Sequence, residues 1–160
     1  WGCRLWHRDH RGTGQLMRGL VGAAGRDANF LLNVGPMPTG EIQPEFVERM
    51  RGIGAWLQRH GESIYGTRGG PIAPRPWGVT TQRGNRVFVH VLSWQDAELA
   101  LPALPRHVRV ATLLADGSRV AFRETPRGVT LTLPPRAAGE VDQVVVLELA
   151  PAAPAHRIGT

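Results

Sequence analysis

A short apolar run that stops abruptly at Gly35 and Pro36 constrains the fold of this chain more than any other feature. Its members are Phe30, Leu31, Leu32 and Val34. A run this short, closed by Gly-Pro, is typical of a strand that is buried on both faces, as in a parallel sheet covered by helices. The sequence therefore predicts a buried strand over residues 29–34.

An amphipathic segment follows the turn at Thr39 and Gly40. Pro44 suits the first position of a helix, where its missing N–H costs nothing. Apolar residues then recur at spacings of three and four, at Phe46, Met50, Ile53 and Leu57, with Val47 and Trp56 widening the stripe. This spacing places them on one helix face. Strand, short loop and amphipathic helix together make one β/α unit.

A second helix is predicted before this unit. Thr13 is a candidate N-cap, Gly25 offers the stop, and the apolar side is formed by Leu16, Met17, Leu20, Val21 and Ala24. Residues 1–12 are polar and irregular, which favours a loop. The loop contains His7, Asp9 and His10, but their spacing fits no familiar set of metal ligands, so we expect solvated side chains there.

Beyond residue 68 the composition changes. Glycines and prolines over 68–76 indicate a linker. From there on apolar and β-branched residues favour strands over 86–92, 108–114, 119–122, 128–133 and 143–149. Turns are predicted at Arg83-Gly84-Asn85 and at Asp116-Gly117. These signals predict an antiparallel β-sandwich over 77–150 and a flexible tail over 151–160.

Three blocks in the first part carry a family resemblance. They are Asn29-Phe-Leu-Leu-Asn-Val-Gly-Pro36, Ile53-Gly-Ala-Trp-Leu57 and Gly61-Glu-Ser-Ile-Tyr-Gly-Thr67. In order and spacing they resemble the last β/α unit of the α-L-fucosidases of glycoside hydrolase family 29. The resemblance implies that residues 1–67 are the C-terminal end of a (β/α)8 TIM barrel, an α/β fold, followed by the all-β sandwich. Trp1-Gly2-Cys3 departs from the family's Trp-Gly-Tyr, which weakens any inference about that local contact.

Glycoside hydrolysis generally requires two carboxyl groups that flank the scissile bond. The only acids near such positions here are Asp9, Asp27 and Glu41. Asp27 precedes its predicted strand and so belongs to the opposite face of a barrel, and the other two stand in no recognisable catalytic context. The resemblance implies that the nucleophile and the acid/base lie on earlier strands and loops. We therefore expect no catalytic residue in this chain and predict that the chain alone is inactive.

Part of a sugar pocket is nevertheless expected. The resemblance places Trp1 against the apolar side of fucose, whereas a buried or frayed terminal tryptophan is the alternative. Asn33, at the end of the predicted strand, could orient neighbouring groups or simply cap its loop. Trp77 and Trp94 could stack on sugars, although tryptophans at a domain interface are more common. The resemblance implies no metal and no organic cofactor.

Composition and charge bear on the partners. The net charge is +6, all 19 basic residues are arginine, and the charge is spread evenly along the chain. Nucleic-acid-binding modules more often concentrate it in a patch, so we expect no nucleic-acid partner, and no apolar run is long enough to predict a membrane span. The chain opens at Trp1 without Met, which suggests a piece of a longer protein. The expected partners are a fucosylated glycan or fucoside and the missing N-terminal part of the barrel. The alternative is a non-catalytic carbohydrate-binding or structural sandwich attached to barrel remnants.

Overall fold

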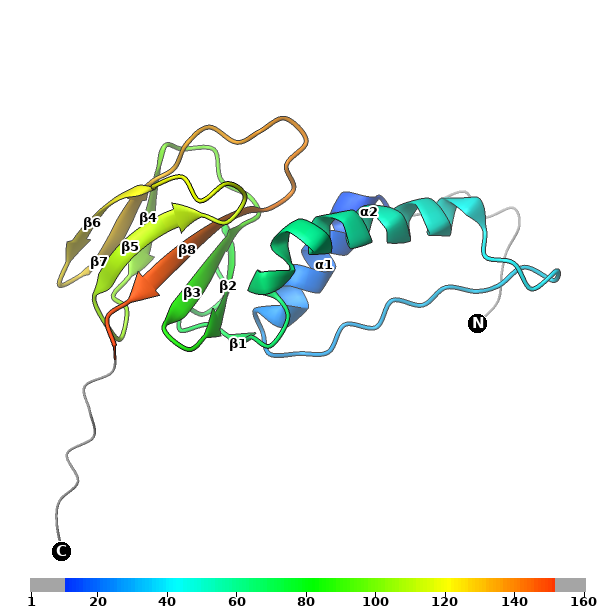
Figure 1. The fold of residues 1–160 in the computed structure, drawn as a ribbon, viewed down its shortest axis with the longest axis horizontal. Helices are drawn as coiled ribbons and strands as arrows, with labels where there is room; N and C mark the ends of the chain where they lie inside the picture. The colour runs from blue at the N-terminus through cyan, green and yellow to red at the C-terminus, as the bar shows by residue number, and fades with distance from the viewer. Residues whose placement is uncertain (1–10, 152–160) are drawn as a thin grey trace, which may run out of the picture.

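The computed structural model describes residues 11–151, in which two helices are followed by two antiparallel sheets (Figure 1). The helical elements are α1 (Thr13–Ala24), α2 (Pro44–His60) and the short 3-10 helix η1 (Gly61–Ser63). The strands are β1 (Arg68–Gly69), β2 (Gly78–Arg83), β3 (Arg86–Val91), β4 (Glu98–Pro102), β5 (Val108–Leu113), β6 (Ala121–Thr125), β7 (Gly128–Thr132) and β8 (Gln143–Leu149).

Both predicted helices are present. Pro44 is the first residue of α2, and Gly25 is the C-cap of α1, as expected. The prediction that Thr13 caps α1 was wrong: Thr13 is its first residue and Gly12 is the N-cap. The side chain of Gln15 accepts a hydrogen bond from the Gly12 N–H at 3.1 Å, so it satisfies one of the backbone donors that a helix start leaves open.

The predicted strand over residues 29–34 does not form. These residues run alongside α1 without a β partner, and the side chain of Leu31 is 82% exposed. The physical reason is that a strand needs neighbours to bond its backbone, and the described residues contain no strand that pairs with this one. Phe30 instead approaches Gly19 of α1, whose missing side chain leaves room for the ring.

The β region was predicted better than the strand before it. One sheet has the order β1-β2-β3-β8-β5, the other β4-β7-β6, and every pairing is antiparallel. The turns at Gly84-Asn85 and Asp116-Gly117 are present as expected: the first joins the paired strands β2 and β3, and the second leads from β5 of the larger sheet to β6 of the smaller one. β6 lies a few residues later than predicted, and β2 and β4 were missed. β2 is buried on both faces over most of its length, so its residues show no alternation of polar and apolar.

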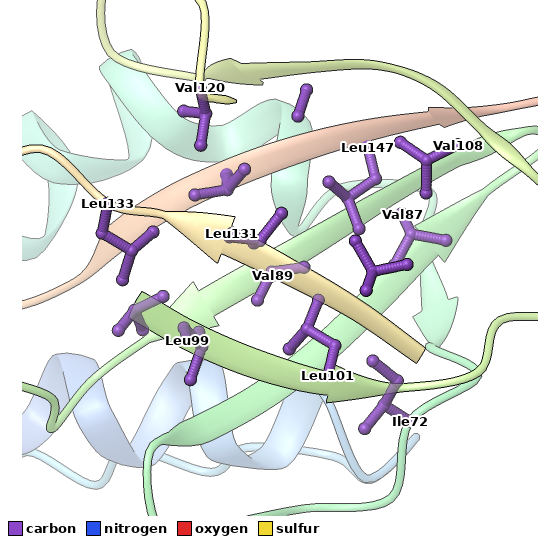
Figure 2. Packing of buried hydrophobic residues seen from close by; sticks show 14 of the residues in the cluster. Ile72, Val87, Val89, Leu99, Leu101, Val108, Val120, Leu131, Leu133 and Leu147 are labelled. Carbon is purple, nitrogen blue, oxygen red and sulfur yellow. The ribbon is translucent and has the colours of Figure 1, made fainter. Parts of the chain in front are cut away.

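The two sheets pack face to face around one apolar core (Figure 2). Its members include Val87 and Val89 of β3, Leu147 of β8, and Leu99, Leu101 and Leu131 of the smaller sheet. Ile72 also belongs to this core, and β1 pairs with β2. Residues 68–76 thus contribute both backbone and side chain to the β structure, while the division of the chain into domains at 67 and 77 stays a prediction.

The helices pack against the other face of the larger sheet, at β2. Val79 of β2 packs with Val21 of α1 and with Ile53 and Trp56 of α2. The predicted apolar face of α2 is only partly the buried one, because the buried residues of α2 are Ile53, Trp56 and His60, whereas Met50 remains 46% exposed. The first half of α2 extends beyond the sheet (Figure 1), so its apolar side chains find less cover there.

Candidate functional site

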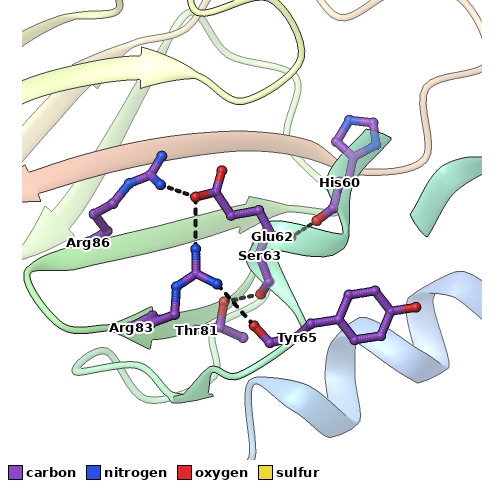
Figure 3. A network of polar contacts seen from close by, with 7 residues as sticks. All are labelled: His60, Glu62, Ser63, Tyr65, Thr81, Arg83 and Arg86. Carbon is purple, nitrogen blue, oxygen red and sulfur yellow. Dashed lines mark hydrogen bonds and ion pairs between the residues drawn. The ribbon is translucent and has the colours of Figure 1, made fainter. Parts of the chain in front are cut away.

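The segment that follows α2 joins the helices to the larger sheet. It is the block 61–67, in which Glu62 forms ion pairs with Arg83, at 2.8 Å, and with Arg86 (Figure 3). Both arginines lie at the β2–β3 hairpin. All three side chains are partly exposed, so the pairs are screened by water and orient the junction more than they stabilise it.

A buried hydrogen-bond chain continues from this junction into the sheet. Ser63 donates its hydroxyl to the carbonyl of His60 at 2.7 Å, and the carbonyl of Ser63 accepts from the Thr81 hydroxyl at 2.6 Å. Thr81 Oγ1 also lies 3.1 Å from Nε2 of His90, and His90 Nδ1 lies 2.7 Å from Oδ2 of Asp142. Four of these side chains, those of Ser63, Thr81, His90 and Asp142, are fully buried.

The directions of these hydrogen bonds determine which ring nitrogens of His90 carry a proton. A threonine hydroxyl has one proton, and Thr81 gives it to the carbonyl of Ser63, so Nε2 of His90 must be the donor to Thr81. A second proton then lies between Nδ1 of His90 and Oδ2 of Asp142. The pair has no net charge, whether this proton belongs to the histidine (imidazolium and carboxylate) or to the aspartate (imidazole and carboxylic acid). A neutral pair is the form that a buried site tolerates.

Thr81, His90 and Asp142 carry the groups of a nucleophile–base–acid triad, but they cannot act as one. The Thr81 hydroxyl donates to a backbone carbonyl instead of to His90, and none of the three side chains is exposed. A nucleophile must reach its substrate and give its proton to the base. The arrangement is therefore structural and ties the segment after α2 to the centre of the sheet.

The acids singled out from the sequence have structural surroundings where the structure describes them. Asp27 bonds Arg68 at 2.6 Å and the N–H of Gly69 at 3.3 Å, from a backbone with φ of 58° that a residue with a side chain rarely adopts. Glu41 is exposed in a turn, where it accepts a hydrogen bond from Thr39. Asp9, with His7 and His10, lies outside the described residues.

Of the two residues predicted to line the sugar pocket, only Asn33 lies within the described part of the chain. Trp1 lies outside the described residues, so its role stays a prediction. Asn33 is exposed, and within residues 11–151 its side chain makes no hydrogen bond. Of the two tryptophans weighed for sugar stacking, Trp77 is buried in the sandwich core, whereas Trp94 is half-buried at its edge.

Two cavities lie where the helices meet the sheets. The larger, of about 630 Å³, is bounded by α1, α2 and the loop over 137–142. Its two acids are Glu140 and Asp142, and the second is engaged with His90, so the cavity does not offer a pair of free carboxyl groups. The other, of about 600 Å³, lies between α1 and the loops before β4 and before β8, and contains Arg18, Trp94 and Arg136.

Among the described residues no three His, Cys, Asp or Glu side chains gather into a group that could hold a metal ion. None of the helices over residues 11–151 combines the length and the hydrophobicity that crossing a bilayer requires.

Sequence reasoning missed the buried chain from Ser63 to Asp142. A weak signal was available: His90 stands in a run of β-branched and aromatic residues, Arg86-Val-Phe-Val-His-Val91, that reads as buried on both faces. A histidine inside such a run needs hydrogen-bond partners. Nothing in the sequence indicated that the partner would be Asp142, since the pairing depends on the register of β3 against β8.

Comparison with known proteins adds the family. The family model described as "Alpha-L-fucosidase" matches residues 1–62. Tissue α-L-fucosidase of Rattus norvegicus is 29% identical over 133 residues, which are 75% of this chain and 27% of the rat protein. The chain thus spans little more than a quarter of that relative.

Solved structures of similar proteins match nearly the whole chain. α-L-Fucosidase isoenzyme 1 from Paenibacillus thiaminolyticus superposes with a TM-score of 0.84 at 33% identity, over 94% of this chain and 37% of that one. A family 29 α-L-fucosidase from Bacteroides thetaiotaomicron gives a TM-score of 0.82 at 25% identity, over 94% and 36%. Taken with the three sequence blocks, these matches show that the chain belongs to the α-L-fucosidases of glycoside hydrolase family 29.

Proposed function

We propose that the chain is the C-terminal part of a retaining α-L-fucosidase that removes terminal α-linked L-fucose from glycans. In this proposal residues 1–67 are the last units of the (β/α)8 barrel, 68–76 the linker and 77–150 the sandwich. The catalytic carboxyl groups belong to the part of the barrel outside this chain. No metal or organic cofactor is required.

One observation carries the proposal. The likeness to the Paenibacillus α-L-fucosidase extends over 94% of the chain, so the helices and both sheets stand in a similar relation in the two proteins. The exposed run around Leu31 supports the same conclusion. An apolar segment that lies unpaired beside two helices is what remains of a barrel strand when its neighbouring strands are absent.

The reaction would be a double displacement. A carboxylate attacks the anomeric carbon while a second carboxyl group protonates the departing oxygen, and water then hydrolyses the fucosyl-enzyme ester. A trapped covalent intermediate, in complex with 2-fluoro-fucosyl fluoride, has been described for the Bacteroides enzyme, and this supports retention. Within this chain we assign Trp1 to the apolar wall of the fucose pocket and Asn33 to its surroundings.

A chimera tests the proposal. The matching 37% of the Paenibacillus protein would be replaced by this chain, and hydrolysis of an aryl α-L-fucoside would be measured. We expect turnover well above that of the Paenibacillus protein truncated at the same point, because the barrel closes only when its last strand is present. A folded chimera that stays as inactive as the truncated protein contradicts the proposal and favours the non-catalytic sandwich.

The same chimera tests the pocket wall. Trp1→Ala should lower kcat/KM by an amount corresponding to about 1–3 kcal/mol, because it removes the aromatic face that shields the apolar side of the sugar. A kcat/KM that stays within about twofold of the unchanged chimera means that Trp1 does not line the pocket.

A further inference from the structure

Two arginines from distant parts of the chain converge on one backbone carbonyl. Arg18 of α1 donates to the carbonyl oxygen of Leu92 at 2.6 Å, and Arg136, in the loop before β8, donates to the same oxygen at 3.2 Å. The second guanidinium nitrogen of Arg136 bonds the carbonyl of Val91 at 2.5 Å. The two donor nitrogens on Leu92 therefore lie at most about 5.8 Å apart, a separation at which like charges repel.

Within residues 11–151 no carboxylate pairs with these two charges. Among residues 11–151 no Asp or Glu side chain comes within 4.0 Å of either guanidinium group. Asp96 lines the same cavity but forms no ion pair with them. Two close cations without a neighbouring carboxylate among the described residues are an arrangement that an anion would complete.

The cavity beside the arginines has room for a ring and a surface to hold it. Its volume is about 600 Å³, and Trp94 forms part of its wall. The indole N–H of Trp94 donates to the carbonyl of Glu98 at 3.1 Å, which orients the ring, and the half-buried ring packs against the sandwich core with one side while it lines the cavity with the other. Aromatic faces pack against the C–H side of a sugar, while charged groups bind its polar substituents.

We propose that this cavity binds an acidic saccharide, with its carboxylate or sulfate group between Arg18 and Arg136 and its ring against Trp94. The site consists of residues within this chain alone and does not depend on the proposed fucosidase activity. The planar, multiply donating guanidinium groups suit an oxyanion of either kind, since each can give two hydrogen bonds to it. The carboxylate of Asp96, which lines the same cavity, repels a bound anion. Its removal should therefore strengthen binding, whereas removal of an arginine should weaken it.

The test uses the 160-residue chain, labelled with ¹⁵N, at constant ionic strength. The probes are a methyl galactoside 6-sulfate, a methyl glucuronide, the neutral methyl galactoside and inorganic sulfate. The Trp94 indole resonance, assigned with Trp94→Phe, reports binding. We expect the acidic glycosides to shift it with dissociation constants in the millimolar range or tighter, the stronger of the two identifying the oxyanion. The neutral glycoside should leave it unchanged, and sulfate alone should bind more weakly than the sulfated sugar.

Variants separate the site from general attraction to a basic chain. Arg18→Gln should weaken binding about tenfold, because it removes one of the two charges. Arg26→Gln is the matched control, an exposed arginine near the end of the same helix that also bonds a backbone carbonyl, that of Gly22, and it should leave the affinity unchanged. Asp96→Asn should tighten binding, and this variant keeps the test intact if Arg18→Gln fails to fold.

Any of the following results overturns the proposal: no shift of the Trp94 indole resonance with either acidic glycoside, equal binding of the neutral glycoside, or equal affinities in the Arg18 and Arg26 variants. Binding of inorganic sulfate as tight as that of the sulfated sugar would also contradict it, because the ring would then contribute nothing.

Discussion

Asp142 Oδ2 lies 2.7 Å from Nδ1 of His90, and neither side chain is exposed. The pair connects the loop before β8 to the end of β3 and, through Thr81, to the segment after α2. Breaking one member of a buried pair leaves the other without its partner, which costs more than the pair contributes.

The pair gives the first prediction. Asp142→Ala should lower the free energy of unfolding by about 3–5 kcal/mol, because Nδ1 of His90 loses the carboxylate that it contacts. Asp142→Asn should cost clearly less, since a neutral His90 that keeps its proton on Nε2 can accept a hydrogen bond from the amide. Urea unfolding followed by tryptophan fluorescence measures both, and equal losses would contradict the proton arrangement.

The ion pairs of Glu62 should contribute little. Glu62→Gln is expected to lower stability by at most about 1 kcal/mol, because all three side chains are partly exposed and screened by solvent. The difference should shrink further as salt is added. Glu48→Gln is the control: its contact with Arg49 is 3.9 Å long and Glu48 is 83% exposed, so no change is expected. A loss of several kcal/mol in Glu62→Gln would show that the junction depends on these pairs.

The end of α1 lies close to β2 at Gly25, where the absence of a side chain permits the contact with Val79. A Cβ at Gly25 would lie 2.4 Å from Cβ of Val79, while one at Gly54 in α2 would meet nothing within 4 Å. Only Gly54 has room for a side chain, so alanine substitutions at the two positions should change the stability in opposite directions. Gly25→Ala should destabilise by about 1–3 kcal/mol, since α1 must move away from β2. Gly54→Ala should stabilise by up to about 1 kcal/mol through its higher helix propensity. Thermal unfolding of the two variants measures this, and similar melting temperatures would mean that α1 does not pack on β2.

Asp116 supplies a prediction about pH. Hydrogen bonds from the side chain and the backbone N–H of Ser118 hold the pKa of Asp116 below its usual value. A carboxyl group with a lowered pKa in the folded state stabilises it above the pKa of the unfolded chain, and this contribution disappears as the pH falls through the folded value. Ser118→Ala should move the pKa up towards the ordinary value, as followed by NMR titration of the Asp116 side chain. An unchanged titration would exclude the Ser118 hydroxyl as the main cause.

The parts of the fold that local pattern determines were predicted well. The β-branched run over 143–149 and the hairpin at Gly84-Asn85 appeared where expected, because side-chain shape and turn chemistry act over a few residues. The strand over 29–34 was wrong for the opposite reason. Its sequence suits a buried strand, but a strand is completed only by neighbours that the described residues do not provide.

The contacts of the site depended on long-range pairing. His90 and Asp142 are 52 positions apart, and Arg18 and Arg136 meet at Leu92 only after the helices have packed on the sheet. Neither of these long-range contacts produces a local sequence pattern from which it could be predicted. Trp94, in contrast, was singled out from the sequence by residue type alone, and the structure places it at the edge of a cavity.

Amide hydrogen exchange over residues 29–34 tests the central claim, that this run is a barrel strand whose neighbours lie outside the chain. In the 160-residue chain alone we expect strong protection in β3 and β8 and little over 29–34, because these amides have no strand to bond. In the chimera with the Paenibacillus barrel the same amides should become protected. Protection over 29–34 in the monomeric chain alone, comparable to that of β3, would contradict the account.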